Sequence, residues 1–284
     1  MSRLSKDDFL YKYREFCFKI CWWIQSMIVP SLKYSQYLYE DILRFHVDPN
    51  VKWLDLGCGH QLLPSWRSSE EKNLIGCSKM IVGIDYDLYS LKNHKNISLK
   101  IRGDITELPF KGNSFHLVTA NMVIEHLENP NIQFQEIKRI LKPGGVLIFH
   151  TPNILGYTTM IARCIPRRLK NRLLYLFQGR KAEDVFDTYY RSNTRGKIIN
   201  LAEANGFQVL KIKMIVSSPQ LVIIPPLVIF ELFWIRILMG KVFKPFRTNI
   251  IAILKNNNKN LKEFRRRLPS TQEVKLYDRS GLYG

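Results

Sequence analysis

The chain has 284 residues, of which 46% are apolar and 12% aromatic, and this composition excludes a largely disordered protein. Lys and Arg outnumber Asp and Glu by 43 to 24, and the net charge of +19 predicts an anionic partner: a nucleic acid, a membrane surface or a phosphorylated substrate. Five cysteines, an odd number without a C-x-x-C pair, indicate neither a disulfide framework nor a zinc site, so no metal is expected.

Residues 1–47 are predicted to form an N-terminal helical lid. Apolar side chains recur at spacings of three and four and define one face of a helix that ends before Pro30: Phe9, Tyr13, Phe16, Ile20, Trp23 and Met27. Such a stripe is typical of a helix packed on a core or over a bound ligand, and membrane contact is the alternative. The first fifteen residues carry charges throughout and lack the layout of a signal peptide. The cysteine usage fits a reducing cytosol best, so we expect a cytoplasmic protein.

Strand and helix patterns alternate regularly from residue 48 to residue 255. Five apolar strand patterns lie between helical patterns, at residues 51–56, 80–85, 97–104, 116–121 and 145–151. This alternation predicts an α/β fold with a mostly parallel sheet and helices on both of its faces. A helix and a sixth strand follow at residues 198–216. A seventh strand, at residues 248–255, is expected to pair antiparallel with the sixth across an apolar insertion at residues 217–247.

Two of the predicted helices have sequence signals at their ends. Ser68 and Glu71 form the S-x-x-E pattern of a capping box at the start of the helix between the first two strands. Residues 131–141 have apolar side chains at helical spacing, and the run Pro143-Gly144-Gly145 is predicted to end that helix before the fifth strand.

Residues suited to ligand binding stand where the first three strands end. The turn Gly57-Cys58-Gly59 follows the first strand, and glycine lets a chain turn sharply and approach a ligand closely. Asp85 ends the second strand 26 residues after Gly59, where a carboxylate accepts hydrogen bonds from both hydroxyls of a ribose. Asp104 ends the third strand, where an acid can accept from the exocyclic amine of adenine. These three strand ends together predict a site for one adenosine.

Five segments between residues 50 and 153 resemble the ordered motifs of class I S-adenosylmethionine-dependent methyltransferases of the type 11 group: WLDLGCG, VGIDYD, GDITELPF, FHLVTANMVIEHL and LKPGGVLIFHTPN. The resemblance implies a Rossmann-like, seven-stranded sheet, the class I methyltransferase fold, and S-adenosylmethionine as the cofactor. It also implies the cofactor-binding residues: Asp55, Gly57, Cys58 and Gly59 around the methionine part, Asp85 with the adjacent Tyr86 at the ribose, Asp104 and Ile105 at the adenine, and Asn121 beside the sulfonium.

The turn departs from the family pattern at Gln61, where a third glycine is common. A dehydrogenase is the nearest rival, but its G-x-G-x-x-G would need glycine at Leu62, and the chain has no Tyr-x-x-x-Lys. A dinucleotide's pyrophosphate requires the glycine-rich helix start. Because S-adenosylmethionine has no phosphate, bulkier side chains after Gly59 favour the methyltransferase.

Methyl transfer needs a base only if the accepting atom carries a proton, because the sulfonium is already activated. His126 is the candidate general base, since a histidine exchanges protons near neutral pH. The alternative interpretation of Glu125-His126 is a helix start satisfied by local hydrogen bonds.

Three regions outside the shared motifs are candidates for acceptor binding. Residues 165–181 carry six basic residues and no acid beside an apolar side, which is typical of contact with an anionic membrane or head group. Tyr189, Tyr190 and Arg191 are predicted acceptor contacts. Residues 221–239 are apolar, but Pro225-Pro226 and two charges argue against a membrane span, so we expect a segment that lies on a bilayer or covers an apolar acceptor; a buried helix is the alternative.

The sequence therefore predicts an S-adenosylmethionine-dependent methyltransferase that acts on a small-molecule or lipid-like acceptor and contacts the inner face of an anionic membrane peripherally. RNA or protein methylation is the first alternative, which the charge favours. Against it, the fourth strand leads to ANMV and not to an N/D-P-P-Y motif, so nucleic acid is not the expected partner. A cofactor-binding scaffold without activity is the second alternative. Residues 256–284 form a basic tail, and no pattern indicates an oligomeric state.

Overall fold

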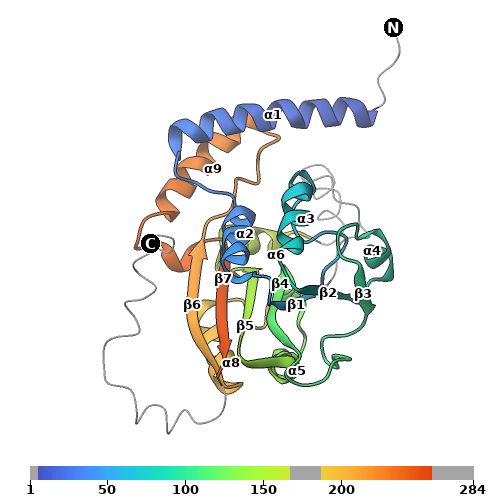
Figure 1. The fold of residues 1–284 in the computed structure, drawn as a ribbon. Helices are drawn as coiled ribbons and strands as arrows, with labels where there is room; N and C mark the ends of the chain where they lie inside the picture. The colour runs from blue at the N-terminus through green and yellow to red at the C-terminus, as the bar shows by residue number, and fades with distance from the viewer. Residues whose placement is uncertain (1–5, 167–186, 258–284) are drawn as a thin grey trace.

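The computed structural model describes residues 6–166 and 187–257, with side chains from residue 12 onward (Figure 1). The predicted basic segment 165–181 lies outside these residues except for its first two positions. Of the predicted tail 256–284, only the first two residues are described.

Seven strands form one sheet in the order β3-β2-β1-β4-β5-β7-β6. Their bounds are β1 Lys52–Leu56, β2 Met80–Asp85, β3 Leu99–Arg102, β4 Phe115–Asn121, β5 Leu141–Pro152, β6 Phe207–Ile215 and β7 Asn249–Asn256. Neighbouring strands are parallel except β7, which pairs antiparallel with both β5 and β6. This sheet confirms the predicted fold class and places the reversal of strand order between β1 and β4, where ligands bind in open α/β sheets.

Helices cover both faces of the sheet. The helices are α1 Lys6–Ile28, α2 Ser35–His46, α3 Ser68–Gly76, α4 Leu88–Asn93, α5 Pro130–Ile140, α6 Tyr157–Cys164, α8 Arg195–Ala204 and α9 Pro225–Leu238, with short 3-10 turns η1 Ser65–Arg67, η2 Ile124–His126 and η4 Lys244–Phe246. Along β1, Trp53 packs with residues of α2, α3 and α4, whereas Leu54 packs with residues of α5 and α8. Both faces are buried, which explains the nearly continuous apolar runs of the parallel strands.

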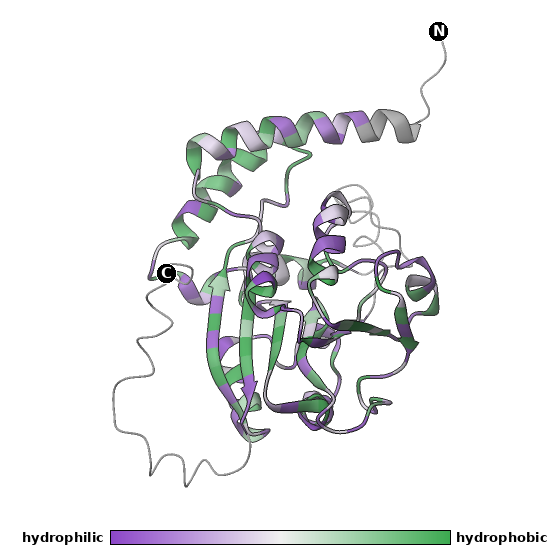
Figure 2. Ribbon diagram, in the orientation of Figure 1, coloured by the Kyte–Doolittle hydropathy of each residue, from purple (hydrophilic) through white to green (hydrophobic). Residues whose placement is uncertain are grey.

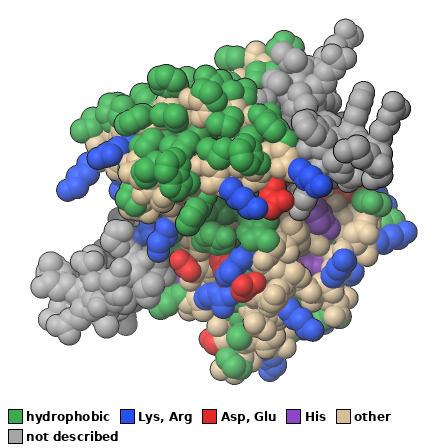
Figure 3. All heavy atoms as spheres, turned by 90° about the horizontal axis from the view of Figure 1, so that it is seen from above, with side chains coloured by type: hydrophobic (Ala, Val, Ile, Leu, Met, Phe, Trp, Pro, Cys, Tyr) green, Lys and Arg blue, Asp and Glu red, His purple; other side chains and the backbone are tan. Residues whose placement is uncertain are grey.

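The N-terminal segment divides into two parts. Helix α2 packs on the sheet through Tyr39 and Leu43, so this part of the predicted lid belongs to the domain core. Helix α1 packs against α9 in a separate apolar cluster, through the buried side chains of Cys17, Cys21 and Ile24. Figure 2 shows the pair at one end of the molecule, and Figure 3 shows hydrophobic side chains spread over its outer side.

Most of the predicted apolar stripe of α1 faces outward, so the stripe does not pack on a core as predicted; of its described side chains, Ile20 is the one that packs against the cluster shared with α9. Phe16 and Trp23 are each 60% exposed and Met27 is 55% exposed. The helix bounds were predicted because the periodicity is clear. The buried face was not, because α1 has apolar residues on more than one side.

The predicted ends of two helices also differ from the structure. Helix α5 ends at Ile140, and Pro143-Gly144-Gly145 lie within β5, where the pairing with β4 shifts register between Phe115 and Leu117. Gly144 has a φ of +79°, which suits this irregular strand start. Ser68 and Glu71 form no capping box: a 3-10 turn precedes α3, its N-cap position is Arg67, and the Glu71 carboxylate binds elsewhere.

Candidate functional site

The turn after β1 requires glycine at two positions. Gly57 has a φ of +60° and Gly59 a φ of +54°, a left-handed conformation that other residues rarely adopt. A Cβ atom on Gly57 would lie 2.5 Å from Cγ2 of Val123, in the segment that follows β4. The turn is therefore held against the end of β4, at the point where the strand order reverses.

Asp85 connects the ends of β1 and β2. Its Oδ2 atom accepts a hydrogen bond from the Gly59 amide at 2.7 Å, and its Oδ1 atom accepts one from the Asp87 amide at 2.8 Å. A carboxylate offers about four acceptor positions. Two amides leave capacity for two further donors, which matches the two hydroxyls of a ribose.

The other predicted adenosine residues lie beside this edge. Asp104 is exposed just after β3, and its Oδ1 atom accepts from the Thr106 amide at 2.8 Å, while Ile105 is half-buried. Tyr86 is 69% exposed, with the Arg102 guanidinium 5.7 Å from its ring centre. The fold thus brings these side chains to the edge that the resemblance implies. Their contacts with a cofactor stay a prediction.

Asp55 and Cys58 lie beneath the turn, each 2% exposed. The Asp55 carboxyl accepts a hydrogen bond from the Thr119 hydroxyl of β4. Burial raises the pKa of Asp55 to about 8, although the Thr119 hydrogen bond opposes this. Burial also raises the pKa of the Cys58 thiol, which faces Gly83, and an inert packing role follows for this cysteine.

Glu71 holds the segment that continues the turn. Its Oε2 atom accepts hydrogen bonds from the amides of Leu62 and Leu63, at 3.0 and 2.8 Å, and its Oε1 atom accepts one from Asn96. Gln61, which stands where the family often has glycine, is exposed. Its side chain therefore meets solvent and does not disturb the turn.

Glu71→Ala is expected to lower the free energy of unfolding by about 3 kcal/mol, because two buried amides lose their acceptor. The measurement is chemical denaturation followed by circular dichroism. Glu70→Ala is the matched control, since Glu70 is partly exposed and pairs with Arg67; its loss should stay below about 1 kcal/mol. Equal losses in the two variants would contradict this role for Glu71.

Asn121, at the end of β4, belongs to a hydrogen-bond network that sequence reasoning missed. Its Nδ2 atom donates to Oε1 of Gln36 at 2.9 Å, and its Oδ1 atom accepts from Nδ1 of His150 at 3.0 Å. Burial lowers the pKa of His150 to about 3, so the ring is neutral. With Nδ1 protonated, Nε2 accepts from Asn249, 2.9 Å away. Three elements thus fix the orientation of the Asn121 amide.

The predicted acceptor segment lies against η2. The backbone carbonyl of Glu125 accepts from the amides of Tyr189 and Tyr190, at 2.8 and 3.1 Å. Nδ1 of His126 donates to the carbonyl of Asp187 at 2.6 Å, which places the basic lone pair of the neutral ring on Nε2. The predicted base and acceptor residues therefore lie together, although their roles stay predictions.

Backbone strain occurs at the same place. Met122, directly after Asn121, has a φ of +57°, and Tyr190 a φ of +51°. Non-glycine residues in this region cost free energy and cluster at functional sites. By contrast, Glu125 has a structural role: its buried carboxylate accepts from the Thr151 hydroxyl at 2.9 Å. Arg191 is exposed beside this segment.

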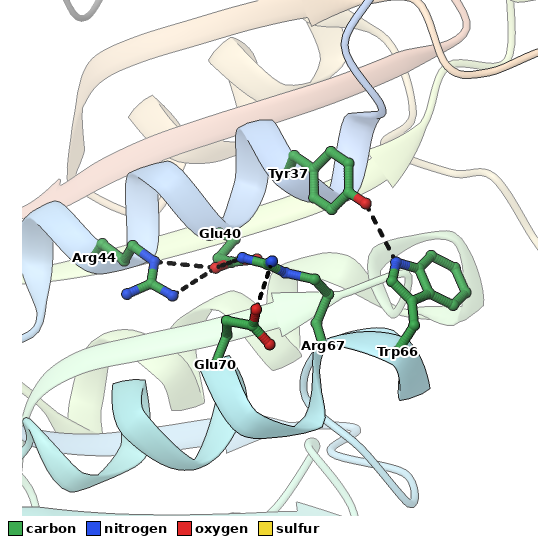
Figure 4. A network of polar contacts seen from close by, with 6 residues as sticks. All are labelled: Tyr37, Glu40, Arg44, Trp66, Arg67 and Glu70. Atoms are coloured by element: carbon green, nitrogen blue, oxygen red, sulfur yellow. Dashed lines mark hydrogen bonds and ion pairs between the residues drawn. The ribbon is translucent and has the colours of Figure 1, made fainter. Parts of the chain in front are cut away.

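A cluster of polar side chains joins α2 to η1 and α3 (Figure 4): Tyr37, Glu40, Arg44, Trp66, Arg67 and Glu70. Glu40 is 2% exposed and accepts from Arg44 and Arg67, each at 2.7 Å. Burial raises the pKa of Glu40, but the two arginines outweigh burial and the net pKa is lowered. The cluster fixes α2, and with it Gln36, above the strand ends.

Comparison with known proteins shows what the chain is similar to. Residues 54–149, about a third of the chain, match the family described as a methyltransferase domain. A methyltransferase from Methanosarcina mazei has the same fold, with a TM-score of 0.50 and 14% identity over 77% of this chain and 98% of that one. A putative methyltransferase from Haloferax volcanii also has a TM-score of 0.50 and 14% identity, over 79% and 91%. The resemblance to class I S-adenosylmethionine-dependent methyltransferases of the type 11 group is thereby confirmed, and S-adenosylmethionine is the cofactor of this class.

Curated relatives match about a third of the chain. Demethylmenaquinone methyltransferase from Staphylococcus haemolyticus is 31% identical over 110 residues, which cover 36% of this chain and 44% of the relative. The enzyme of that name from Staphylococcus carnosus is 33% identical over 109 residues, 36% of this chain and 43% of the relative. The match thus spans less than half of each relative.

Metal binding and membrane crossing find no support in the described residues. Residues 6–166 and 187–257 contain no group of three His, Cys, Asp or Glu side chains arranged to hold a metal ion. Within the same ranges, no helix combines the length and apolarity that a bilayer crossing requires.

Proposed function

We propose that this chain transfers the methyl group of S-adenosylmethionine to a small, apolar, quinone-like or lipid-like acceptor at the inner face of a membrane. The observation that carries the proposal is the Gly57–Gly59 turn bound to Asp85 at the point of strand reversal, beside Asn121. The names of the curated relatives support the acceptor class.

The residues present fit this cofactor. The left-handed glycines let the backbone approach the methionine part, and Asp85 has acceptor capacity for the ribose. Asp104 and Ile105 would hold the adenine, with Tyr86 at the outer side of the ribose. When bound, S-adenosylmethionine supplies a methyl group on an activated sulfonium.

The protein's own groups would orient the acceptor and take up its proton. The fixed amide of Asn121 positions the accepting atom, and Tyr189, Tyr190 and Arg191 bind the rest of the acceptor. If that atom carries a proton, Nε2 of His126 accepts it.

His126→Gln is expected to lower the rate of methyl transfer about 100-fold, because an amide cannot take up the proton. Affinity for S-adenosylhomocysteine should stay within about twofold, since the substitution leaves the turn and Asp85 unchanged. Single-turnover kinetics with labelled cofactor measures the rate, and calorimetry measures the affinity. A rate equal to that of the unaltered protein would show that His126 does not take up the acceptor's proton.

The acceptor class is tested by incubating the protein with methyl-labelled S-adenosylmethionine and cell extract, then separating lipid, RNA, protein and small polar molecules. We expect label in the lipid fraction. Label in RNA or protein would establish the alternative that the charge of +19 favours. Bound cofactor without labelled product in any fraction would indicate a scaffold without activity.

A further inference from the structure

The outward faces of α1 and α9 form one exposed apolar surface, here called the α1–α9 surface. Its largest side chains are between 42% and 73% exposed: Phe16, Trp22, Trp23, Phe230, Phe233 and Trp234. Figure 3 shows these helices as a broad hydrophobic area with Lys and Arg at its border. A soluble monomer rarely exposes so many neighbouring aromatic side chains, so the surface requires a partner.

The α1–α9 surface rests on a firmly connected pair of helices. On the inner side, Val228, Leu232 and Ile235 of α9 are fully buried in the cluster shared with α1. The Tyr13 hydroxyl donates to the carbonyl of Ile223 at 2.9 Å, and the Arg236 guanidinium donates to that of Ile28 at 3.2 Å. Helix α9 is thus apolar on its inner and its outer side, and only the inner side is covered.

Two sets of interior contacts fix the middle and the end of α9 on the domain. Glu231, which is 6% exposed, accepts from the Tyr157 hydroxyl at 2.6 Å and from the amides of Gln220 and Leu221. Arg247 donates to the carbonyls of Leu238, Met239 and Met214. The exposed aromatic residues of α9 therefore lie on a helix that is fixed to the domain.

The charges around the surface are complementary to an anionic bilayer. Residues 12–28 and 224–246 contain six basic residues: Lys12, Arg14, Lys19, Arg236, Lys241 and Lys244. The two acids in these ranges are neutralised or buried, since Glu15 pairs with Lys19 at 2.8 Å and Glu231 is inside. A second copy of the chain would oppose like charges across the contact, whereas anionic lipid attracts them.

The position of the surface relative to the site suits a membrane-bound acceptor. Strands β5 and β6 run toward the end of the molecule that carries α1 and α9 (Figure 1). Asn121 lies opposite His150 near the carboxyl end of β5, so the candidate site is at this same end. Helix α9 has 14 residues, fewer than the roughly 20 that cross a bilayer, and this length favours lying in the interface.

We infer that the α1–α9 surface docks on an anionic phospholipid bilayer, with both helices lying in the plane of the interface and their aromatic side chains inserted below the head groups. The inference deepens the proposed function and rests on it, since it identifies the surface that brings the site to a lipid-like acceptor. Basic side chains at the border contact the head groups while their stems lie along the apolar surface.

The test is flotation of the full chain with vesicles of phosphatidylglycerol and phosphatidylcholine at low salt. The unaltered protein should float, and the double variant Trp22→Ser with Phe230→Ser should bind at least about tenfold more weakly, since each large side chain loses its burial in lipid. The matched control is Ile132→Ser with Leu210→Ser. These residues are 49% and 39% exposed on α5 and β6, and their loss should change binding less than about twofold.

Insertion is distinguished from charge attraction by fluorescence. Vesicles with brominated acyl chains should quench the emission of the unaltered protein, because Trp22, Trp23 and Trp234 of its five tryptophans lie on the surface. Binding without quenching would overturn the inserted geometry. A protein that stays at the bottom with all vesicles would overturn the inference, as would a dimer in sedimentation velocity that the double variant dissociates.

Failure of this inference is distinguishable from failure of the proposed function. Melting temperature and S-adenosylhomocysteine affinity of the double variant should match those of the unaltered protein, which shows that the fold and the cofactor site persist. Methyl transfer to an acceptor dispersed in detergent should then continue. If transfer is absent while vesicle binding is intact, the proposed function alone is wrong.

Discussion

Asp85→Ala is expected to weaken binding of S-adenosylhomocysteine at least about 100-fold. Hydrogen bonds to a charged group contribute about 1.5–3 kcal/mol each, and the ribose offers two hydroxyls. The substitution also removes the acceptor of the Gly59 amide, which lies 2.7 Å from the carboxylate, so the turn loses its orientation toward β2. Isothermal titration calorimetry measures the affinity.

The control for this variant is Asp87→Ala. Asp87 is a carboxylate two residues away that caps α4 by accepting from the amides of Tyr89 and Ser90. Its removal should cost about 1 kcal/mol of stability and leave cofactor affinity within about twofold. Should Asp85→Ala bind S-adenosylhomocysteine as tightly as the unaltered protein, the ribose role of Asp85 is wrong.

Gly57→Ala is the second large effect, and it should lower the free energy of unfolding by about 2–4 kcal/mol. The left-handed φ of +60° costs an alanine about 1 kcal/mol, and the new Cβ would overlap Cγ2 of Val123, which lies 2.5 Å from its ideal position. Relief of this overlap moves the turn away from β4, so cofactor affinity should fall as well. Thermal and chemical denaturation measure the stability.

Gly59→Ala separates the two causes. Gly59 has a similar φ of +54°, but a Cβ there has no neighbour within 4 Å, so only the backbone cost of about 1 kcal/mol should appear. The double variant Gly57→Ala with Val123→Ala should regain part of the lost free energy of unfolding, because the smaller side chain at position 123 relieves the overlap and the two effects are not additive. If Gly57→Ala and Gly59→Ala cost the same, the contact with Val123 has no role.

The strands and the glycine turn were predictable because their causes are local. Buried parallel strands need continuous apolar runs, and Gly57 and Gly59 stand where the chain leaves the first of them. The same holds for Asp85 and Asp104, whose positions at strand ends follow once the strands are assigned. Parallel topology then brings them to one edge without further information.

The Asn121 network was not predictable, because its members come from distant parts of the chain. Gln36 lies 85 positions before Asn121, and Asn249 lies 99 positions after His150. Only the polar His150 within the apolar fifth strand was a signal, since a buried polar group needs partners. The role of Glu71 was predicted wrongly for a related reason. Its sequence pattern matches a capping box, whereas its carboxylate accepts hydrogen bonds from backbone amides of the preceding loop.

The buried face of α1 was predicted wrongly, because periodicity shows which faces of a helix are apolar but not which of them is buried. Cys17, Cys21 and Ile24 form a second apolar face beside the predicted stripe, and packing against α9 selects it. That choice depends on a helix more than 200 positions later in the sequence. Phe16 and Trp23 of the stripe left outside belong to the α1–α9 surface, which we assign to the bilayer.

The central claim is tested most directly by measuring S-adenosylhomocysteine released when the full chain, labelled S-adenosylmethionine and vesicles containing a cellular lipid extract are combined. We expect S-adenosylhomocysteine in a one-to-one ratio with the label in the lipid, and loss of both with Asp85→Ala. Tight binding of S-adenosylmethionine with no S-adenosylhomocysteine formed, whichever extract fraction is added, would contradict it.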